Sequence, residues 1–302
     1  MDEMICLDPK YSTTRLVSTK KQVVENKSEE KFETVLFLRE NEGRKGEGGL
    51  RTKGYFKRSY EGKPLITVIT VVFNGAKYLE ETIQSVINQT YENVEYIIID
   101  GGSTDGTLDI IKKYEDAIDY WVSEKDRGIY DAMNKGIELT MGRYIIHINS
   151  GDYIDNKIVA KIFSRNFNMN SLIIGNVKYV SGRIFSSVMN HGIYFRNTIH
   201  HQSAFYPKSI FLKMGHYNLV YKILSDYHLN LRIYQNKTNI IKISGMVSMC
   251  SDLGVSDTPR FKNYEEEMAI RKEFLKNRVV LILVLNICTL TRFIVKKIMR
   301  KL

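Results

Sequence analysis

Apolar runs alternate with amphipathic stretches between residues 65 and 153, and polar or glycine-rich residues separate them. Runs rich in β-branched or aromatic residues at 65–73, 96–100, 119–123 and 143–148 predict four buried strands. Helical spacing follows the first two runs, with Leu79, Ile83, Val86 and Ile87 after one and Leu108, Ile111 and Tyr114 after the other. Strands that alternate with helices of this length predict a doubly wound, mainly parallel α/β sheet.

The alternation weakens beyond Asp152, which predicts a less regular second half. We expect a helix at 156–167, a hairpin of 172–179 with 183–187, and an extended segment at 198–206. A helix at 221–234, a strand at 239–249 and a charged helix at 261–277 follow. One large domain at 63–258, with a helical tail at 259–302, therefore fits the pattern.

Residues 1–62 mix both charges and carry a glycine-rich stretch at 41–49, so we expect an extension that ends in a flexible linker. The formal net charge is +10 and the three cysteines have no metal-ligand spacing, which favours a reduced cytosolic compartment. Much of the positive charge sits at 276–302, and no basic-aromatic pattern of a nucleic-acid-binding module appears. We therefore expect no nucleic-acid partner.

Polar side chains follow the predicted strands where parallel sheets hold ligands. Asp100 ends the second strand, Phe73 and Asn74 end the first, and 149–152 closes the fourth. Neither the G-x-G-x-x-G fingerprint nor a G-x-x-x-x-G-K-[ST] loop is present, so the usual dinucleotide and P-loop sites are not predicted.

Five ordered segments carry a resemblance to a known family: 71–75 (VVFNG), 85–90 (SVINQT), 99–107 (IDGGSTDGT), 124–136 (EKDRGIYDAMNKG) and 149–152 (NSGD). In this order they resemble glycosyltransferase family 2, over about residues 65–255. The resemblance implies a GT-A fold with an acceptor-side extension. It also implies transfer of a sugar from a nucleotide-diphosphate-sugar to an acceptor with inversion.

The resemblance places Phe73, Asn74, Asp100, Gly128, Asp131 and Asn134 at the nucleotide-sugar. Local chemistry leaves alternatives open, because Asp100 also suits a turn and an acid such as Asp131 is favoured in the first turn of any helix. Asp152 is the expected ligand of Mg²⁺ or Mn²⁺ on the diphosphate. Gly151 stands where related sequences often carry a second acid, so the metal rests on Asp152 alone, and a simple turn acid is the alternative.

The resemblance also implies an acceptor side. His201 and Gln202 match a His-Gln motif beside the sugar and acceptor, although a core or hydrogen-bonding role stays open for both. Adjacent histidines in an extended strand point to opposite faces, so a shared zinc ion with His200 is not expected. Asp226, in Ser-Asp-Tyr, matches the general base, with a solvated helix acid as the alternative. The loop 250–256 matches one that closes over the diphosphate, except at Leu253.

The C-terminal segment is apolar from 279 to 285, and charge returns at Arg292, about 13 residues after Arg278. This run is too short to span a bilayer. Wound as a helix, its polar positions (Asn286, Thr289, Arg292, Lys296 and Arg300) form one stripe opposite a wide apolar face. The pattern predicts an amphipathic helix lying on an anionic membrane surface, and the alternative is a helix packed on the protein itself.

The resemblance, taken with these features, implies a cytosolic glycosyltransferase, hexosyl or N-acetylhexosaminyl, on the inner face of the cell membrane. It would use a saccharide or lipid-linked acceptor in cell-surface polysaccharide biosynthesis. One rival is a nucleotidyltransferase, which would need a glycine-rich basic loop that 71–77 does not supply. The other is a degenerate sugar-nucleotide-binding scaffold protein, which only Gly151 favours.

Overall fold

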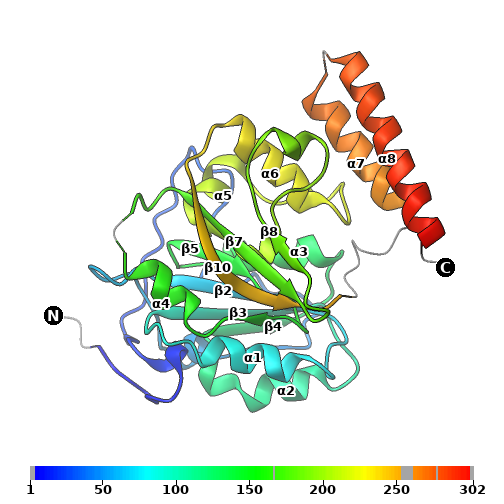
Figure 1. Cartoon of the computed structure of the whole chain (residues 1–302). Coiled ribbons are helices and arrows are strands. Elements are labelled where there is room, and N and C mark those ends of the chain that lie inside the picture. The colour runs from blue at the N-terminus through cyan, green and yellow to red at the C-terminus, as the bar shows by residue number, and fades with distance from the viewer. Residues whose placement is uncertain (1–3, 166, 253–260, 277, 300–302) are drawn as a thin grey trace.

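The computed structural model describes residues 4–165, 167–252, 261–276 and 278–299, and it is a mixed sheet flanked by helices (Figure 1). The strands are β1 Gly46–Gly48, β2 Ile66–Val72, β3 Val94–Asp100, β4 Tyr120–Ser123, β5 Tyr144–His147, β6 Tyr153–Ile154, β7 Leu172–Tyr179, β8 Ile184–Ser186, β9 Ala204–Pro207 and β10 Ile240–Cys250. Their order is β1-β4-β3-β2-β5-β9-β7-β10-β6, with β8 paired to β7.

The four strands predicted from the apolar runs form the parallel half of this sheet, in the order β4-β3-β2-β5. Alternate side chains enter two different cores. Val68 and Ile98 pack with helix α1 (Leu79–Ile87), whereas Ile69 and Ile97 pack with helix α3 (Ile129–Glu138) on the other face. Because both faces are covered, the runs are continuously apolar. The predicted doubly wound fold is confirmed.

The second half of the sheet joins the first through β9, which is antiparallel to both β5 and β7. The expected hairpin is present as β7 with β8, and β10 lies parallel to β7. The remaining α-helices are α2 Thr107–Lys113, α4 Ile158–Phe163, α5 Lys208–Met214, α6 Ser225–Gln235, α7 Phe261–Phe274 and α8 Val279–Met299. The 3-10 helices are η1 Ser12–Thr14, η2 Leu50–Lys53, η3 Glu115–Ala117, η4 His191–Tyr194 and η5 His201–Ser203.

The glycine-rich stretch predicted as a flexible linker is instead an ordered edge of the sheet. Its residues 46–48 form β1, antiparallel to β4. A Cβ added to Gly48 would lie 2.7 Å from Trp121 Nε1, so glycine is needed for this close approach. A sequence does not distinguish glycines of a flexible linker from glycines that pack against another strand, because the distinction depends on the strand that they contact.

Buried charges fix the N-terminal segment to the sheet. The Arg51 guanidinium is 3% exposed, pairs with Glu95 at 2.6 Å and donates to the carbonyl of Leu139. Lys57 Nζ donates to the carbonyl of Val94 at 2.6 Å, and burial lowers the pKa of Lys57 to about 8. Residues 46–57 are therefore built into the sheet's edge, while the predicted boundary near residue 62 stays a prediction.

The C-terminal helices α7 and α8 form a pair that projects from the sheet beyond α6 (Figure 1). The apolar run was expected to be too short for a bilayer, but α8 continues through Arg292 to Met299, and Val279–Ile298 is long and apolar enough to cross one by length and composition. The polar positions Thr289 and Arg292 contact α7. The apolar side is exposed instead, with Val280 76% and Ile287 63% accessible.

Candidate active site

Polar and aromatic side chains follow several strand ends at the carboxyl edge of the parallel strands. Phe73 and Asn74 follow β2, Asp100 ends β3, and the loop 149–152 follows β5. Adjacent parallel strands present these ends to one crevice. The crevice is therefore built from segments more than 70 residues apart in the chain.

Asp100 is fully buried at the end of β3 and holds the turn behind it. Its carboxylate accepts hydrogen bonds from the backbone N–H of Gly102 and Ser103 and from the hydroxyl of Ser123, at 3.2, 3.0 and 2.5 Å. Ser103 Oγ in turn accepts from the Asn74 N–H at 2.7 Å. Asp100 thus rigidifies the loop that carries Asn74, which is consistent with the turn alternative, and its nucleotide-binding role stays a prediction.

Phe73 and Asp126 form the rim of the crevice near that turn. The Phe73 ring is 65% exposed. A Cβ on Gly101 would lie 3.3 Å from this ring and 2.5 Å from Asp126 Oδ2, so both side chains converge on one glycine. Burial raises the pKa of Asp126. Sequence reasoning missed Asp126, although its position just after β4 offered the same signal that identified Asp100.

Helix α3 begins at the crevice, with Gly128 as its N-cap at φ +122°. Asp131, in the first turn, accepts from the backbone N–H and the guanidinium of Arg127 at 3.0 and 2.7 Å. Burial raises the pKa of Asp131, but the hydrogen bonds and charge of Arg127 outweigh this and lower it. The Asn134 amide exchanges two hydrogen bonds with the backbone of Tyr217, so its contacts here are structural.

Asp152 is 8% exposed, and both of its carboxylate oxygens are held by the protein. Gln202 Nε2 donates to Oδ2 at 2.6 Å, and the backbone N–H of Ser251 donates to Oδ1 at 2.8 Å. Burial raises the pKa of Asp152. Gly151 has φ +91°, a conformation that strains a residue with a Cβ. The backbone therefore explains why a glycine stands where a second acid was looked for.

The prediction that the two adjacent histidines lie on opposite faces of a strand is wrong. Residues 201–203 form the 3-10 helix η5 and only the end of the 198–206 segment is extended, so the rings of His200 and His201 stack with centroids 5.2 Å apart. His200 Nδ1 accepts from the Gln202 N–H, and burial lowers the pKa of His200 to about 3. His201 Nε2 lies 3.2 Å from Asn149 Nδ2.

Asp226 lies in the first turn of α6 and is 7% exposed. Its Oδ1 faces the Tyr130 hydroxyl at 3.0 Å and the Tyr227 N–H at 2.8 Å. Its Oδ2 accepts from Asn197 Nδ2 at 2.9 Å and lies 3.5 Å from His201 Nδ1. Burial raises the pKa of Asp226, but hydrogen bonding and charge from His201, with the Tyr130 hydrogen bond, lower it overall.

Polar contacts connect the candidate base to the candidate metal ligand. Asp226 contacts His201, which contacts the Asn149 amide, while the Asn149 N–H donates to Gln202 Oε1 at 3.2 Å and Gln202 donates to Asp152. With Nδ1 protonated toward Asp226, His201 Nε2 is an acceptor for the Asn149 amide. A buried carboxylate with a lowered pKa is thus linked by polar contacts to an oxygen-rich loop, an arrangement suited to removing a hydroxyl proton beside an anionic leaving group.

Sequence reasoning missed Tyr130 and Asn197, which hold the two oxygens of Asp226. Tyr130 was passed over because Ile129, Met133 and Ile137 already accounted for the helix as core spacing. No local signal marked Asn197. The predicted loop residues from Leu253 to Ser256 lie outside the described residues.

The loop after β5 offers oxygen donors for a hard cation. Asn149 Oδ1 and Ser150 Oγ are buried and have no hydrogen-bond partner among the described residues. With Asp152 the loop contains carboxylate, amide and hydroxyl oxygens, the ligand types that Mg²⁺ accepts together with phosphate and water. In the described part of the chain no three His, Cys, Asp or Glu side chains cluster as a metal site. Phosphate oxygens and water would therefore have to complete the coordination of the ion.

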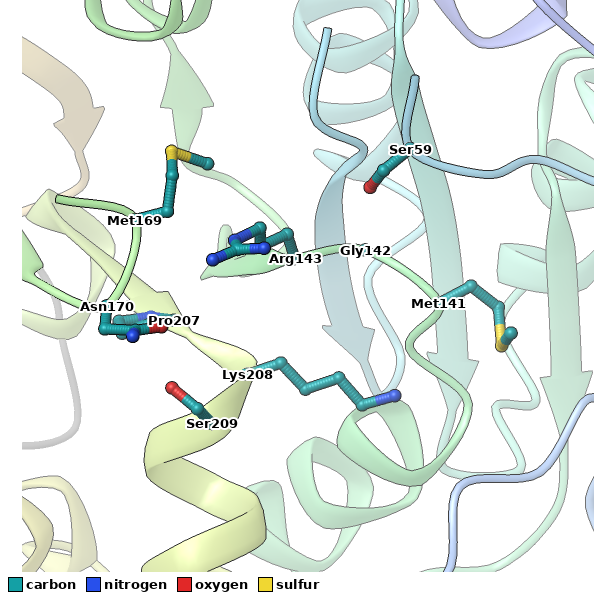
Figure 2. A pocket seen from close by; sticks show the side chains of 9 residues that line it. All are labelled: Ser59, Met141, Gly142, Arg143, Met169, Asn170, Pro207, Lys208 and Ser209. Carbon is teal, nitrogen blue, oxygen red and sulfur yellow. The ribbon is translucent and has the colours of Figure 1, made fainter. Parts of the chain in front are cut away.

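A hollow of about 360 Å³ lies at the opposite edge of the sheet, where β5 begins and β9 ends (Figure 2). It is lined by Ser59, Met141, Gly142, Arg143, Met169, Asn170, Pro207, Lys208 and Ser209. The Arg143 and Lys208 side chains point away from each other, and Lys208 Nζ donates to the carbonyl of Thr140. Without convergent polar groups it does not resemble a ligand site.

Comparison with known proteins adds evidence on the family and the fold. The family described as "Glycosyl transferase family 2" matches residues 67–229. A PGL/p-HBAD biosynthesis glycosyltransferase of Mycobacterium bovis (strain BCG / Pasteur 1173P2) is 28% identical over 223 residues, covering 70% of this chain and 83% of the relative. The putative teichuronic acid biosynthesis glycosyltransferase TuaG of Bacillus subtilis is 41% identical over 93 residues, covering 30% and 37%.

Solved structures share the fold at low sequence identity. The S. aureus TarS 1–349 complex with UDP-GlcNAc matches with a TM-score of 0.57 and 18% identity, covering 70% of this chain and 71% of that one. The mannosyltransferase PcManGT of Pyrobaculum calidifontis, in complex with GDP-Man and Mn²⁺, matches with a TM-score of 0.53 and 16% identity, covering 78% and 76%. Both neighbours hold a nucleotide-sugar.

Proposed function

The chain belongs to glycosyl transferase family 2, and we propose that it is an inverting enzyme that moves a sugar from a nucleotide-diphosphate-sugar to a saccharide or lipid-linked acceptor. The proposal includes hexosyl or N-acetylhexosaminyl transfer and a role in cell-surface polysaccharide biosynthesis. Relatives named for PGL/p-HBAD biosynthesis and for teichuronic acid biosynthesis support this class of product. Rivals without transfer chemistry would not need an ionised base beside the crevice.

The observation that carries the proposal is the set of contacts from Asp226 through His201 to the loop of Asp152. In the proposed step, the acceptor hydroxyl gives its proton to Asp226 while its oxygen forms a bond to C1 of the donor sugar. The bond from C1 to the diphosphate oxygen breaks on the opposite face, and the nucleoside diphosphate leaves with that electron pair. One carboxylate suffices for such a single displacement.

His201 and Asn197 orient the base in this mechanism. Both reach Asp226 Oδ2, at 3.5 and 2.9 Å, whereas Oδ1 is held by Tyr130 and by the backbone. The N–H groups keep the carboxylate ionised by stabilising its charge. Gln202 contacts both Asp152 and the backbone of Asn149 at the sugar side of the crevice.

The donor side would use the ends of β2 and β3 with the start of α3. The exposed Phe73 ring offers a face for a base, and Asn74, Asp100 and Asp131 line or hold the same crevice. Gly128 caps a helix of 10 residues, and the dipole of such a helix favours a diphosphate at its start.

Asp152 would hold Mg²⁺ or Mn²⁺, with Asn149 and Ser150 as further oxygen donors. A bound divalent ion would neutralise the charge that develops on the departing diphosphate. Mn²⁺ in the PcManGT complex supports this choice of cofactor.

Membrane attachment through α8 is part of the proposal, on the inner face of the cell membrane. Its exposed side carries Val279, Val280, Leu283, Val284, Ile287, Leu290, Ile294, Val295 and Ile298. Exposed Lys296 and Lys297 follow this apolar face and suit anionic headgroups. Because Thr289 and Arg292 bind α7, the helical pair rather than a lone helix would meet the lipid.

Thermal unfolding with a panel of UDP-, GDP- and dTDP-sugars, each with and without Mn²⁺, tests the donor class. A ligand at about 100 times its Kd adds about 2.7 kcal/mol of stability, which for a chain of this size raises Tm by about 4 °C. We expect one nucleoside family to do so, and more strongly with Mn²⁺. A chain that no nucleotide-sugar or nucleoside diphosphate stabilises would refute the proposal.

A further inference from the structure

Helix α7 contacts the element that carries Asp226, although no chemistry was assigned to it from the sequence. Two acids on one face of α7, Glu266 and Glu273, both reach residues around α6. Ile270 between them is buried in a small core with Tyr227 and Leu231 of α6. The C-terminal helical pair therefore packs directly behind the candidate base.

Glu266 binds the backbone that leads into α6. Its Oε1 accepts from the N–H of Lys222 at 2.9 Å, and its Oε2 accepts from Ile223 and Leu224 at 2.9 and 3.0 Å. Leu224 is the N-cap of α6 and has no side chain that can cap it, so Glu266 binds the N–H groups of the turn just before this helix. Asp226 lies two residues after Leu224, in the first turn of α6. A carboxylate that is 8% exposed and accepts three N–H groups is a specific, charge-assisted anchor.

The opposite side of the same turn is tied to the donor side of the crevice. The Tyr130 hydroxyl of α3 lies 2.8 Å from the carbonyl of Ile223 and 3.0 Å from Asp226 Oδ1. Glu273 adds a second tie, since it accepts from the Tyr221 hydroxyl at 2.9 Å and lies 3.1 Å from His228 Nε2. The turn at 222–224 is thus held between α3 and α7.

Helix α8 braces α7 from its other side. The fully buried Arg271 donates to Thr289 Oγ1 and to the carbonyl of Phe195, both at 2.7 Å. Glu267 pairs with Arg271 and, at 2.7 Å, with Arg292 of α8. Alternate faces of α7 therefore contact α8 and the turn before Asp226.

We propose that Glu266 is a positioning residue for sugar transfer, because it holds the 222–224 turn and so sets Asp226 against the acceptor. This rests on Asp226 being the base of the proposed function. The C-terminal helices are then part of the transfer machinery, in addition to any contact with lipid. A misplacement of the base by about 1 Å is enough to cost about 100-fold in rate.

The test uses the full-length protein with Glu266→Gln and Glu266→Ala, and with Glu265→Gln as the control. Glu265 is exposed one position earlier on α7, so its substitution makes the same charge change away from the turn. We expect kcat to fall about 10- to 100-fold for Glu266→Ala and less for Glu266→Gln, which keeps one acceptor oxygen. Nucleoside diphosphate affinity should stay within two-fold, and amide hydrogen exchange at 222–224 should accelerate.

A kcat for Glu266→Ala within two-fold of the parent would overturn the proposal. So would unchanged exchange at 222–224, an equal loss in Glu265→Gln, or a fall in nucleotide affinity as large as the fall in kcat. If Glu266→Ala does not fold, Glu266→Gln decides by the same criteria. Asp226→Asn in parallel separates the two claims: if it transfers sugar normally the base assignment fails, and if it alone is inactive the base stands and Glu266 is only structural.

Discussion

Replacing Asp226 by asparagine should preserve the fold and donor binding but remove most transfer. The substitution keeps the side-chain shape, but an amide has one acceptor oxygen where the carboxylate has two. Both carboxylate oxygens face N–H groups, from Tyr227 at Oδ1 and from Asn197 at Oδ2. In either orientation of the new amide, its NH₂ group must face the N–H of Tyr227 or the amide N–H of Asn197, which leaves a donor without an acceptor.

The two expected losses differ in size. One unsatisfied buried donor costs about 1–3 kcal/mol of folding stability, whereas a domain typically has about 5–15 kcal/mol, so the variant should stay folded. Loss of a general base lowers the rate by about 10²–10⁴-fold, which corresponds to about 2.7–5.4 kcal/mol in activation free energy. Activity should therefore disappear before structure does.

The assay is transfer at saturating donor, with nucleoside diphosphate affinity by calorimetry and Tm measured on the same samples. Asp116→Asn is the matched control, because it makes the same chemical change at a side chain that is 90% exposed. Turnover of Asp226→Asn within a few-fold of the parent would show that another group takes the proton. A parallel loss of nucleotide affinity would show that Asp226 acts in donor binding.

The pH dependence gives an independent check on the same residue. Burial acts to raise the pKa of Asp226, but hydrogen bonding and charge from His201, with the Tyr130 hydrogen bond, lower it. A base works when ionised, so a lowered pKa keeps it active until the pH falls below the ordinary aspartate value of about 4. We expect no loss of kcat from this group between pH 5 and 8, and an acidic limb near pH 6–7 that disappears in Asp226→Asn would contradict the assignment.

Three further predictions concern the metal loop, the tail and the N-terminal segment. Asp152→Ala should abolish the Mn²⁺-dependent part of nucleoside diphosphate binding, whereas Asp100→Ala should weaken binding even without metal; calorimetry that finds identical defects would contradict this division. Truncation after residue 277 should leave nucleotide-sugar binding intact and remove salt-sensitive binding to anionic vesicles, and a full-length protein that ignores such vesicles at low salt would rule the attachment out. Arg51→Met should lower the free energy of unfolding by about 3–5 kcal/mol in chemical denaturation, because it strands the buried Glu95 carboxylate, and a loss below about 1 kcal/mol would show that the pair is not buried in solution.

The parallel half of the fold could be predicted because its information is local. Each strand between residues 66 and 147 is a run of β-branched and aromatic residues, and β2, β3 and β5 begin or end within about one to two residues of the predicted limits. Asp100 and Asp152 could be placed at one edge because parallel strands share an edge. The stacking of His200 on His201 could not, because the backbone turns at η5 rather than extending.

The rest of the site depends on contacts that sequence spacing does not encode. Tyr130 reaches Asp226 across 96 positions, and Asn197 reaches it across 29. A helical pattern shows which face Tyr130 occupies but not what its hydroxyl touches. The sequence shows the polar stripe of α8. It does not show that Arg292 in this stripe binds Glu267, because that contact depends on how α7 packs against α8.

The glycine edge strand has a consequence for synthesis in the cell. Gly48 pairs with Trp121, which leaves the ribosome about 70 residues later. At about 5–20 residues per second, residues 46–48 wait about 4–15 s for β4. Until they dock, β4 offers an open strand edge, the kind of surface on which chains associate wrongly. Residues 46–48 therefore cannot pair until β4 has been made, and a nascent chain cleaved within them would leave that edge open.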